Sequence, residues 1–223
     1  MMHLKESKRV YELIDLGLIN YNEAFEIQKD CLKKVYEKSS GGFLLYCEHN
    51  PVFTLGRSAS EENILINSNE AKLRGIEIIK TNRGGDVTFH GIGQLVAYPI
   101  FDLKKHYMDV HRFMRDIEKV VICSLEKLGI HSFRIDGKTG VWTEEGKIAS
   151  IGLALSKWIS YHGVAINLNV DTRYFDMIYP CGFKDIKITS AKQILKKKID
   201  SDIFKGIISR EFERVFSIVI ANK

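Results

Sequence analysis

The sequence predicts an α+β fold in which a mixed or antiparallel sheet is flanked by helices. Three observations support this class. Helical patterns stand near the start, in the middle and at the end of the chain, strand-like runs fill the stretches between them, and tight-turn signals separate the later strands. The sequence lacks the regular alternation of strand and helix that is typical of a doubly wound fold. Because no linker composition interrupts the chain, we expect one domain over residues 1–223.

The first helix is predicted over residues 21–38, where residues suited to a buried face recur at helical spacing. Gly41 and Gly42 follow and are expected to end this helix. The recurring residues are Tyr21, Ala24, Phe25, Gln28, Leu32, Val35 and Tyr36.

Short strands and one short helix are predicted next. Residues 42–49 and 52–57 have strand character, residues 67–75 have a helical pattern, and residues 76–82 alternate as a strand does. Residues 83–103 contain a glycine-rich turn, a strand, a second turn and a second strand. The first half of the chain therefore contributes mainly strands.

The clearest helix of the chain is predicted over residues 110–130, because a continuous apolar face recurs through it. Residues 130–170 then form successive strands, with tight-turn signals at Asp136-Gly137 and Glu145-Gly146. From Ser190 onward the pattern predicts helices. The face of the middle helix consists of Phe113, Ile117, Val120, Val121, Ser124, Leu125 and Leu128.

The composition is that of a soluble globular protein with a sizeable core. Of the 223 residues, 45% are hydrophobic and 27% are charged. No apolar stretch of about 20 residues predicts a membrane span, and the charged N-terminal segment predicts no signal peptide. We therefore expect a cytoplasmic protein that does not act at a membrane.

The four cysteines show neither a CxxC pair nor the spacing of a zinc site, so no metal is predicted. Cys31, Cys47 and Cys123 stand in apolar or helical contexts and are expected to be buried and unreactive. A reducing compartment fits this usage. Cys181 differs, because Pro180 and Gly182 enclose it in a predicted turn that a substrate could reach.

The formal net charge of +5 is mild and spread along the chain. The one dense run, residues 196–198, is expected to be a solvated face. Since no basic stripe with interleaved aromatic residues occurs, nucleic-acid binding is not predicted. A mildly positive surface would suit acidic protein partners.

The densest motif covers residues 83–94, with the sequence RGGDVTFHGIGQ. Its four glycines permit positive φ angles and a close approach of the backbone to a ligand, and Arg83 and His90 add polar groups. The motif lacks the GxxxxGK[ST] phosphate loop and does not open a helix as a GxGxxG motif does. From composition alone, two hairpin turns around a strand, with His90 capping a turn, are the favoured explanation.

At three further positions the local sequence does not decide between a catalytic role and a structural one. Lys147 begins the run KIASIG after a turn and reads locally as an exposed lysine. His162 stands in an apolar strand, where a hydrogen-bonded core histidine is the usual outcome. Cys181 requires a nearby cation to favour its thiolate, and the sequence alone does not bring Lys147 and Cys181 together.

Taken together, four ordered segments resemble the lipoyl(octanoyl) transferase family. They are residues 49–58, 83–103, 140–171 and 179–182. The resemblance implies a fold similar to the catalytic domain of biotin and lipoate protein ligases. One departure is visible, because Ile92 stands where the family usually has proline, and the turn loses the rigidity that proline confers.

The resemblance implies a role for each matched residue. Cys181 aligns with the nucleophile that carries the acyl thioester, and Lys147 aligns with the lysine that lowers the cysteine pKa and shuttles protons. Fourteen residues align with substrate-binding segments: Arg83, Gly84, Gly85, Asp86, Val87, Thr88, Phe89, His90, Ser150, Ile151, Gly152, Gly163, Val164 and Ala165.

The implied reaction moves an octanoyl group from octanoyl-acyl carrier protein to a lysine of a lipoyl domain, either in a dehydrogenase subunit or in the glycine-cleavage carrier. Backbone amides near Gly152 and Gly163 would stabilise the oxyanion. Glycines between residues 84 and 93 would line a narrow apolar tunnel, with His90 near its mouth. No cofactor and no metal are implied, and a monomer is expected.

Three alternatives remain open at the level of sequence. An ATP-dependent lipoate or biotin protein ligase would share the fold and would need no cysteine. A non-catalytic binder of carrier proteins would have no use for Lys147 and Cys181. A cysteine hydrolase would pair the thiol with His90 or His162.

Overall fold

The computed structural model of the chain describes residues 9–180 and 186–222. Its helices are α1 (Tyr21–Tyr36), α2 (Ser68–Leu73), α3 (Val110–Glu126), α4 (Ala191–Leu195) and α5 (Ser201–Phe216). Its strands are β1 (Arg9–Ile19), β2 (Gly42–His49), β3 (Val52–Leu55), β4 (Glu77–Lys80), β5 (Val87–His90), β6 (Gln94–Phe101), β7 (Phe133–Ile135), β8 (Lys138–Thr143), β9 (Gly146–Ser156), β10 (Ile159–Asn167) and β11 (Ile218–Asn222). Short 3-10 helices lie at Glu61–Asn63, Leu103–Lys105 and Thr172–Met177.

Within the described residues, the strands form two sheets. The large sheet has eight strands in the order β11-β1-β2-β6-β10-β9-β8-β7, and the small sheet has three in the order β4-β3-β5. In the large sheet β11, β1 and β2 are parallel, and each pairing from β2 to β7 is antiparallel. The small sheet pairs β3 with β4 in parallel and with β5 antiparallel. The predicted α+β class with a mixed sheet is confirmed.

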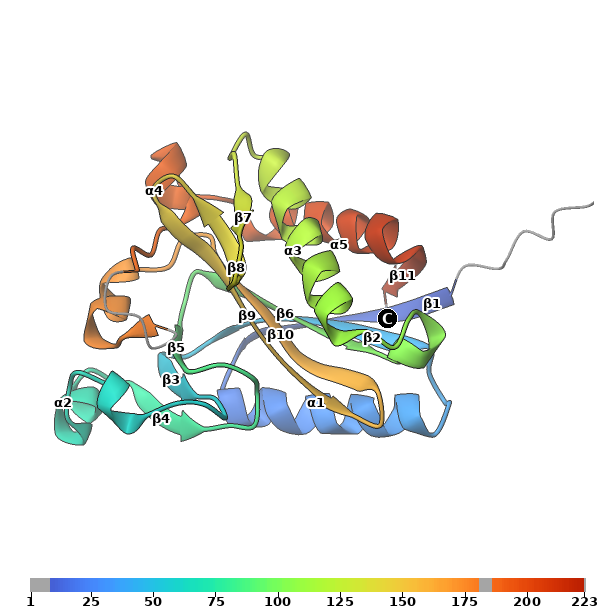
Figure 1. The fold of residues 1–223 in the computed structure, drawn as a ribbon, viewed down its shortest axis with the longest axis horizontal. Coiled ribbons are helices and arrows are strands. Elements are labelled where there is room, and N and C mark those ends of the chain that lie inside the picture. Colours follow the sequence, from blue (N-terminus) through green and yellow to red (C-terminus); the bar gives the residue numbers. More distant parts are fainter. Residues whose placement is uncertain (1–8, 181–185, 223) are drawn as a thin grey trace, which may run out of the picture.

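Helices cover both faces of the large sheet, as Figure 1 shows. Because side chains alternate along a strand, β6 turns Leu95 and Ala97 toward α3 and α5, and Val96 and Tyr98 toward α1. We call these two sides the α3–α5 face and the α1 face. The alternation places two separate cores on one set of strands.

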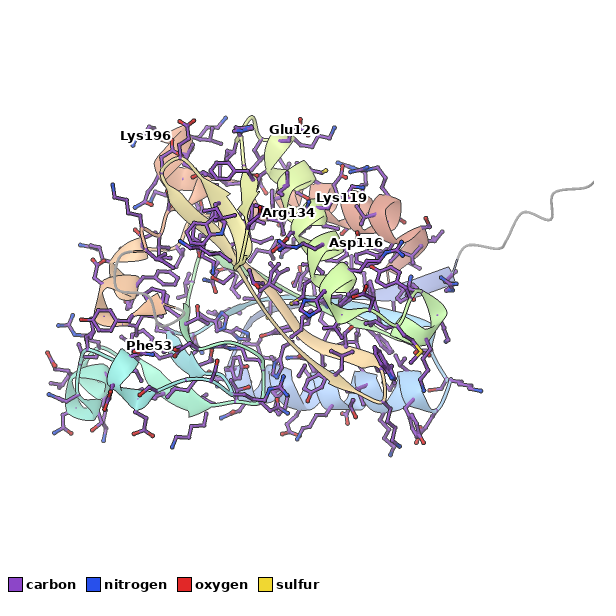
Figure 2. The ribbon with its side chains drawn as sticks, in the orientation of Figure 1. Phe53, Asp116, Lys119, Glu126, Arg134 and Lys196 are labelled. Carbon is purple, nitrogen blue, oxygen red and sulfur yellow. The ribbon has the colours of Figure 1, made fainter. Side chains whose placement is uncertain are left out.

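The small sheet forms a third apolar cluster beside the start of α1. The rings of Phe53 on β3 and Phe89 on β5 lie 5.8 Å apart in an edge-to-face contact. Figure 2 labels Phe53 within this part of the molecule. Tyr21, the first residue of α1, approaches Thr81 after β4 with its hydroxyl 3.2 Å from Thr81 Oγ1. The small sheet is thus fixed against the edge of the α1 face.

The helices predicted over residues 21–38, 67–75 and 110–130 are confirmed as α1, α2 and α3. The C-terminal prediction is wrong at its end, where β11 lies in place of a helix. Ser217 ends α5 by adopting a left-handed φ of 52°, without the glycine or proline that would signal the stop.

Strand β1 has no counterpart in the sequence prediction. It lies in the large sheet between β2 and β11, and about half of its residues remain exposed. Its parallel pairing with β11 joins the two ends of the described chain. No helix formed by residues 9–180 and 186–222 is long and apolar enough to cross a membrane.

Candidate active site

A cavity opens on the α1 face where β6, β9 and β10 meet the loop before β5. It contains about 490 Å³ of empty space, part of which is open to solvent. Both apolar side chains and polar rings form its wall, so it is not the purely apolar tunnel that was expected. The lining residues are Tyr21, Arg83, Gly85, Asp86, Val87, Thr88, His90, Val96, Tyr98, Ser150, Ile151, Gly152, His162, Gly163, Val164 and Ala165. We call this space the main cavity.

Two glycines on neighbouring strands make room for the main cavity. Gly152 on β9 and Gly163 on β10 stand directly opposite each other in the sheet. A Cβ atom on Gly163 would lie 2.0 Å from the carbonyl oxygen of Ala97. A Cβ on Gly152 would lie 3.0 Å from the carbonyl oxygen of Gly84 and 3.1 Å from Cδ of Arg83. A side chain at either position would collide with neighbouring backbone, and at Gly152 it would also press on Arg83, which lines the cavity.

Arg83 shapes the glycine-rich loop through hydrogen bonds to the protein itself. Its Nε and Nη2 atoms donate to Thr54 Oγ1 at 3.1 and 2.9 Å, and Nη2 also donates to the carbonyl of Thr54 at 2.6 Å. Further bonds reach the carbonyls of Asp86 at 2.7 Å and Gly84 at 3.0 Å. The buried guanidinium therefore holds the loop closed around itself. The N–H of Gly84 adds a bond of 2.8 Å to the carbonyl of Leu153 on β9.

Two buried histidines, His90 and His162, line the main cavity, and a third, His49, packs against the His90 ring. Burial, and then the charge of Arg83, lower the pKa of His162 to about 3, and burial lowers the pKa of His49 to about 4. Burial, with further contributions from His49 and Arg83, holds the pKa of His90 well below its usual value. His162 bonds Asn82 Oδ1 through Nε2 at 2.8 Å, as a satisfied core histidine would. All three rings are neutral at neutral pH.

Lys147 lies in a second pocket directly beside the main cavity. Only 3% of its surface is exposed, so the local prediction of an exposed lysine is wrong. Its Nζ atom stands 5.4 Å from the centre of the Trp142 ring, a cation–π distance. The two pockets share Gly85, Asp86, Ile151 and Gly152 as a common wall. One shared wall therefore separates the pocket of Lys147 from the main cavity.

The β7–β8 hairpin supports the Lys147 side chain through Gly140. A Cβ on Gly140, whose φ is 126°, would lie 2.6 Å from Cε of Lys147. The N–H of Gly140 donates to Glu118 Oε1 at 3.0 Å, and the buried Glu118 carboxylate also accepts from Arg115 and Arg134. Figure 2 labels Arg134 between β7 and α3. An ionic cluster around the buried Glu118 carboxylate thus fixes the backbone against which the lysine packs.

The predicted nucleophile Cys181 lies outside the described residues, but the chain on both sides of it is attached to the site. Following it, the N–H of Lys147 donates to the carbonyl of Lys187 at 2.8 Å, and the N–H of Thr189 donates to the carbonyl of Lys147 at 3.0 Å. Preceding it, the N–H of Tyr179 donates to the carbonyl of Asn63 at 2.7 Å.

Asn63 links that preceding segment to the glycine-rich loop. Its Nδ2 atom donates to Asp86 Oδ2 at 2.7 Å. The segment before Cys181 is therefore tied to one wall of the main cavity, and the segment after it is tied to Lys147.

The structure places most of the predicted binding residues in the wall of the main cavity. Two lie elsewhere. Gly84 lines the second pocket, and Phe89 packs into the small-sheet core, because β5 alternates and turns Phe89 away from Thr88 and His90. Gly91 and Gly93 serve the turn between β5 and β6 and do not line the cavity.

Four cavity residues were not among the predicted binding residues: His162, which the sequence analysis took for a core histidine, and Tyr21, Val96 and Tyr98. Tyr21, Val96 and Tyr98 come from α1 and β6, and their positions depend on how these elements pack. No local motif marks them. Only the alternation of β6, which puts Val96 and Tyr98 on one face, could have suggested two of the three.

The fold and the cavity define the class of protein, and solved structures share the fold. The chain superposes on a bi-partite lipoate protein ligase from Thermoplasma acidophilum with a TM-score of 0.77 at 17% identity, covering 96% of this chain and 87% of that one. A biotin protein ligase from Aquifex aeolicus gives a TM-score of 0.52 at 14% identity, covering 92% of this chain and 69% of that one. The predicted likeness of fold is confirmed.

Residues 20–213 match the family model of the lipoyl protein ligase A/B catalytic domain, and the chain belongs to that family. Its sequence relatives narrow the placement to the octanoyltransferases. It is 37% identical to an octanoyltransferase of Cytophaga hutchinsonii, over 99% of this chain and 98% of the relative. It is 40% identical to one of Pelobacter propionicus, over 90% and 93% of the two chains. The resemblance seen in the sequence motifs is confirmed.

Proposed function

We propose that this protein transfers an octanoyl group from octanoyl-acyl carrier protein to the lysine of a lipoyl domain, through a thioester on Cys181. It acts as a monomer and performs the first step of protein lipoylation. The observation that carries the proposal is the pairing of Lys147 with Lys187 and Thr189, in the segment that follows Cys181. This pairing supports a site in which the lysine and the cysteine meet beside the main cavity.

In the first step the Cys181 thiol transfers its proton to Lys147. The thiolate attacks the carbonyl carbon of the octanoyl thioester, and the oxyanion is stabilised by backbone N–H groups near Gly152 and Gly163. The bond to the carrier sulfur then breaks, and the carrier thiolate takes the proton back from Lys147. The products are octanoyl-Cys181 and the free carrier thiol.

In the second step the amine of the acceptor lysine attacks octanoyl-Cys181. The carbon–sulfur bond breaks, and Lys147 moves the proton from the attacking amine to the departing thiolate. An amide is formed and the thiol of Cys181 is restored. An amide is more stable than a thioester, so the transfer proceeds without ATP.

The main cavity supports a medium-length acyl chain as the transferred group. Val87, Val96, Ile151 and Val164 contribute apolar wall, and the glycine pair of β9 and β10 leaves the sheet surface open beneath it. The second pocket, which holds Lys147, continues from the same wall. An acyl chain in the main cavity would therefore place its reactive end toward Lys147.

The competing function on this fold is the ATP-dependent ligase, and an omission series separates the two. Octanoyl-carrier protein and an apo-lipoyl domain are incubated with the protein, and the acceptor is weighed by intact mass spectrometry. We expect octanoylation without ATP, and none from free octanoate with MgATP. Acceptor modification that requires ATP and free octanoate would overturn the proposal.

A further inference from the structure

A buried chain of side-chain hydrogen bonds connects the main cavity to the segment paired with Lys147. His90 Nδ1 lies 2.8 Å from Gln94 Oε1, and Gln94 Nε2 lies 2.9 Å from Asn167 Oδ1. Asn167 Nδ2 lies 3.0 Å from the carbonyl oxygen of Thr189. Gln94, Asn167 and Thr189 are each at most 4% exposed. These hydrogen bonds therefore run through the protein interior from the main cavity to the segment that pairs with Lys147.

Backbone carbonyls fix the direction of every bond in this chain. The carbonyl of Thr189 can only accept, so Asn167 donates through Nδ2 and accepts through Oδ1. Gln94 Nε2 then donates to Asn167 Oδ1, and it also donates to the carbonyl of Phe89 at 3.2 Å. Gln94 Oε1 must accept from His90, which carries its proton on Nδ1. Nε2 of His90 is left as a hydrogen-bond acceptor on a ring that lines the main cavity.

The other end of the chain reaches the backbone of Lys147. The carbonyl of Thr189 accepts from Asn167, and the N–H of the same residue donates to the carbonyl of Lys147 at 3.0 Å. Asn167 therefore bonds both to Gln94 and to Thr189. One of its atoms holds Gln94 and so orients His90, and the other holds the strand-like segment that pairs with Lys147.

We propose that Asn167 and Gln94 are positioning residues for acyl transfer. Asn167 holds residues 187–189 against Lys147, and Gln94 keeps His90 in the Nδ1-protonated form, with a bare Nε2 for an N–H or O–H donor of the bound substrate. This inference rests on the proposed function, because it takes Lys147 as the proton-transfer group and the main cavity as the substrate site.

Asn167→Asp separates the contact with residues 187–189 from the orientation of His90. The aspartate still accepts from Gln94 Nε2, but it cannot donate to the carbonyl of Thr189 and repels it. We expect kcat for octanoyl transfer to fall by about 10- to 100-fold, because small displacements of reacting groups have effects of that size. The KM for the octanoyl donor should stay within about twofold, since the cavity wall is unchanged.

Asn169→Asp is the matched control. Asn169 stands two residues further along and clamps another segment in the same way, with bonds of 2.9 and 2.8 Å to the carbonyl and N–H of Ile199. It lines neither pocket. Its kcat should match that of the wild type when both proteins are measured below their unfolding temperatures. Equal losses of kcat in the two variants would refute a specific role for Asn167.

The His90 tautomer gives a second readout that does not depend on activity. Histidine labelled with ¹⁵N distinguishes protonated from bare ring nitrogens by NMR, and His90→Gln assigns the signal. We expect an Nδ1-protonated His90 in the wild type and in Asn167→Asp, and loss of this preference in Gln94→Leu. An Nε2-protonated His90 in the wild type would overturn the bond directions above.

Different results would refute the proposed function and the positioning role of Asn167. If the wild type transfers no octanoyl group, the proposed function is wrong, whatever the NMR spectrum shows. If the wild type is active and Asn167→Asp retains its full kcat, the proposed function stands and the positioning role of Asn167 is refuted.

Discussion

The two faces of the large sheet differ in what they bury, although the same strands supply both. The α3–α5 face is an apolar core in which Phe113, Phe212 and Phe216 pack around Phe101. The α1 face buries polar groups beside its apolar cluster, and these include His49, His90 and His162. Burying polar groups costs free energy unless each is hydrogen-bonded. The comparison indicates that the phenylalanine cluster of the α3–α5 face mainly stabilises the fold. The main cavity lies on the α1 face, and the pocket of Lys147 is bounded by Val110 and Met114 of α3.

The largest effect is expected from a substitution that removes the amine of Lys147 and leaves the fold intact. Lys147→Met keeps an unbranched side chain of similar length but deletes the amine. We expect kcat for octanoyl transfer to fall by about 10²- to 10⁴-fold, the usual contribution of a proton-transfer group. Lys192→Met, at an exposed position on α4, is the control and should keep wild-type kcat. A Lys147→Met variant with near-normal kcat would remove this lysine from the mechanism.

For the phenylalanine cluster of the α3–α5 face, the expected effect is on stability alone. Phe212 is fully buried, and Phe212→Ala should lower the free energy of unfolding by about 3–5 kcal/mol. The kcat of the remaining folded protein should not change. Urea denaturation measures the loss, and Ile203→Ala on the same helix, at a side chain 63% exposed, should change it by about 0.5 kcal/mol or less. A large fall in kcat for Phe212→Ala would contradict the assignment of a purely stabilising role to this phenylalanine cluster.

The buried histidines of the α1 face predict a loss of stability in mild acid. Burial lowers the pKa of His49 to about 4, whereas the unfolded chain takes up this proton near pH 6.5. Below pH 6.5 the unfolded state therefore binds more protons, and the free energy of unfolding falls as the pH falls toward 4. Between pH 7 and pH 5 the loss from His49 alone should be about 2 kcal/mol.

His49→Gln tests that assignment by urea denaturation at both pH values. The difference in unfolding free energy between pH 7 and pH 5 should shrink by about the same 2 kcal/mol. His131→Gln, at an exposed position, is the control and should leave the difference as in the wild type. If His49→Gln keeps the wild-type pH dependence of the unfolding free energy, the His49 ring does not cause the loss of stability in acid.

The smallest expected effect concerns the turn between β5 and β6. Ile92 is 60% exposed and does not line the main cavity. Ile92→Pro should raise the free energy of unfolding by about 0.4–1 kcal/mol, by restricting the unfolded chain, and should leave kcat unchanged. Thermal unfolding measures the shift. Destabilisation would show that the backbone at Ile92 does not accept proline.

The sequence was sufficient for the parts of the fold that depend on local patterns. The apolar faces of α1 and α3 and the turn glycines around residues 84–93 gave the correct element types. The failures are non-local. Residues 218–222 join β1 across the length of the chain, and Ser217 ends α5 by a left-handed turn that its residue type does not signal.

The site shows the same division between local and non-local information. The motif at residues 83–90 was visible as a candidate because its glycines permit a close approach of the backbone to a ligand, and Arg83 and His90 add polar groups. Burial of Lys147 was not, because it depends on Gly140 and on the pairing with Lys187, which lie in other parts of the chain. Tyr98 was missed for a similar reason, since its place in the cavity follows from the packing of β6 against β10 and α1.

The most direct test of the central claim is to trap the acyl-enzyme. The protein is incubated with octanoyl-carrier protein without an acceptor, and its intact mass is measured. We predict a gain of one octanoyl group that maps to Cys181, is absent in Cys181→Ala, and persists when Cys31, Cys47 and Cys123 are each replaced by alanine. An octanoyl adduct of the same extent in Cys181→Ala would contradict the account.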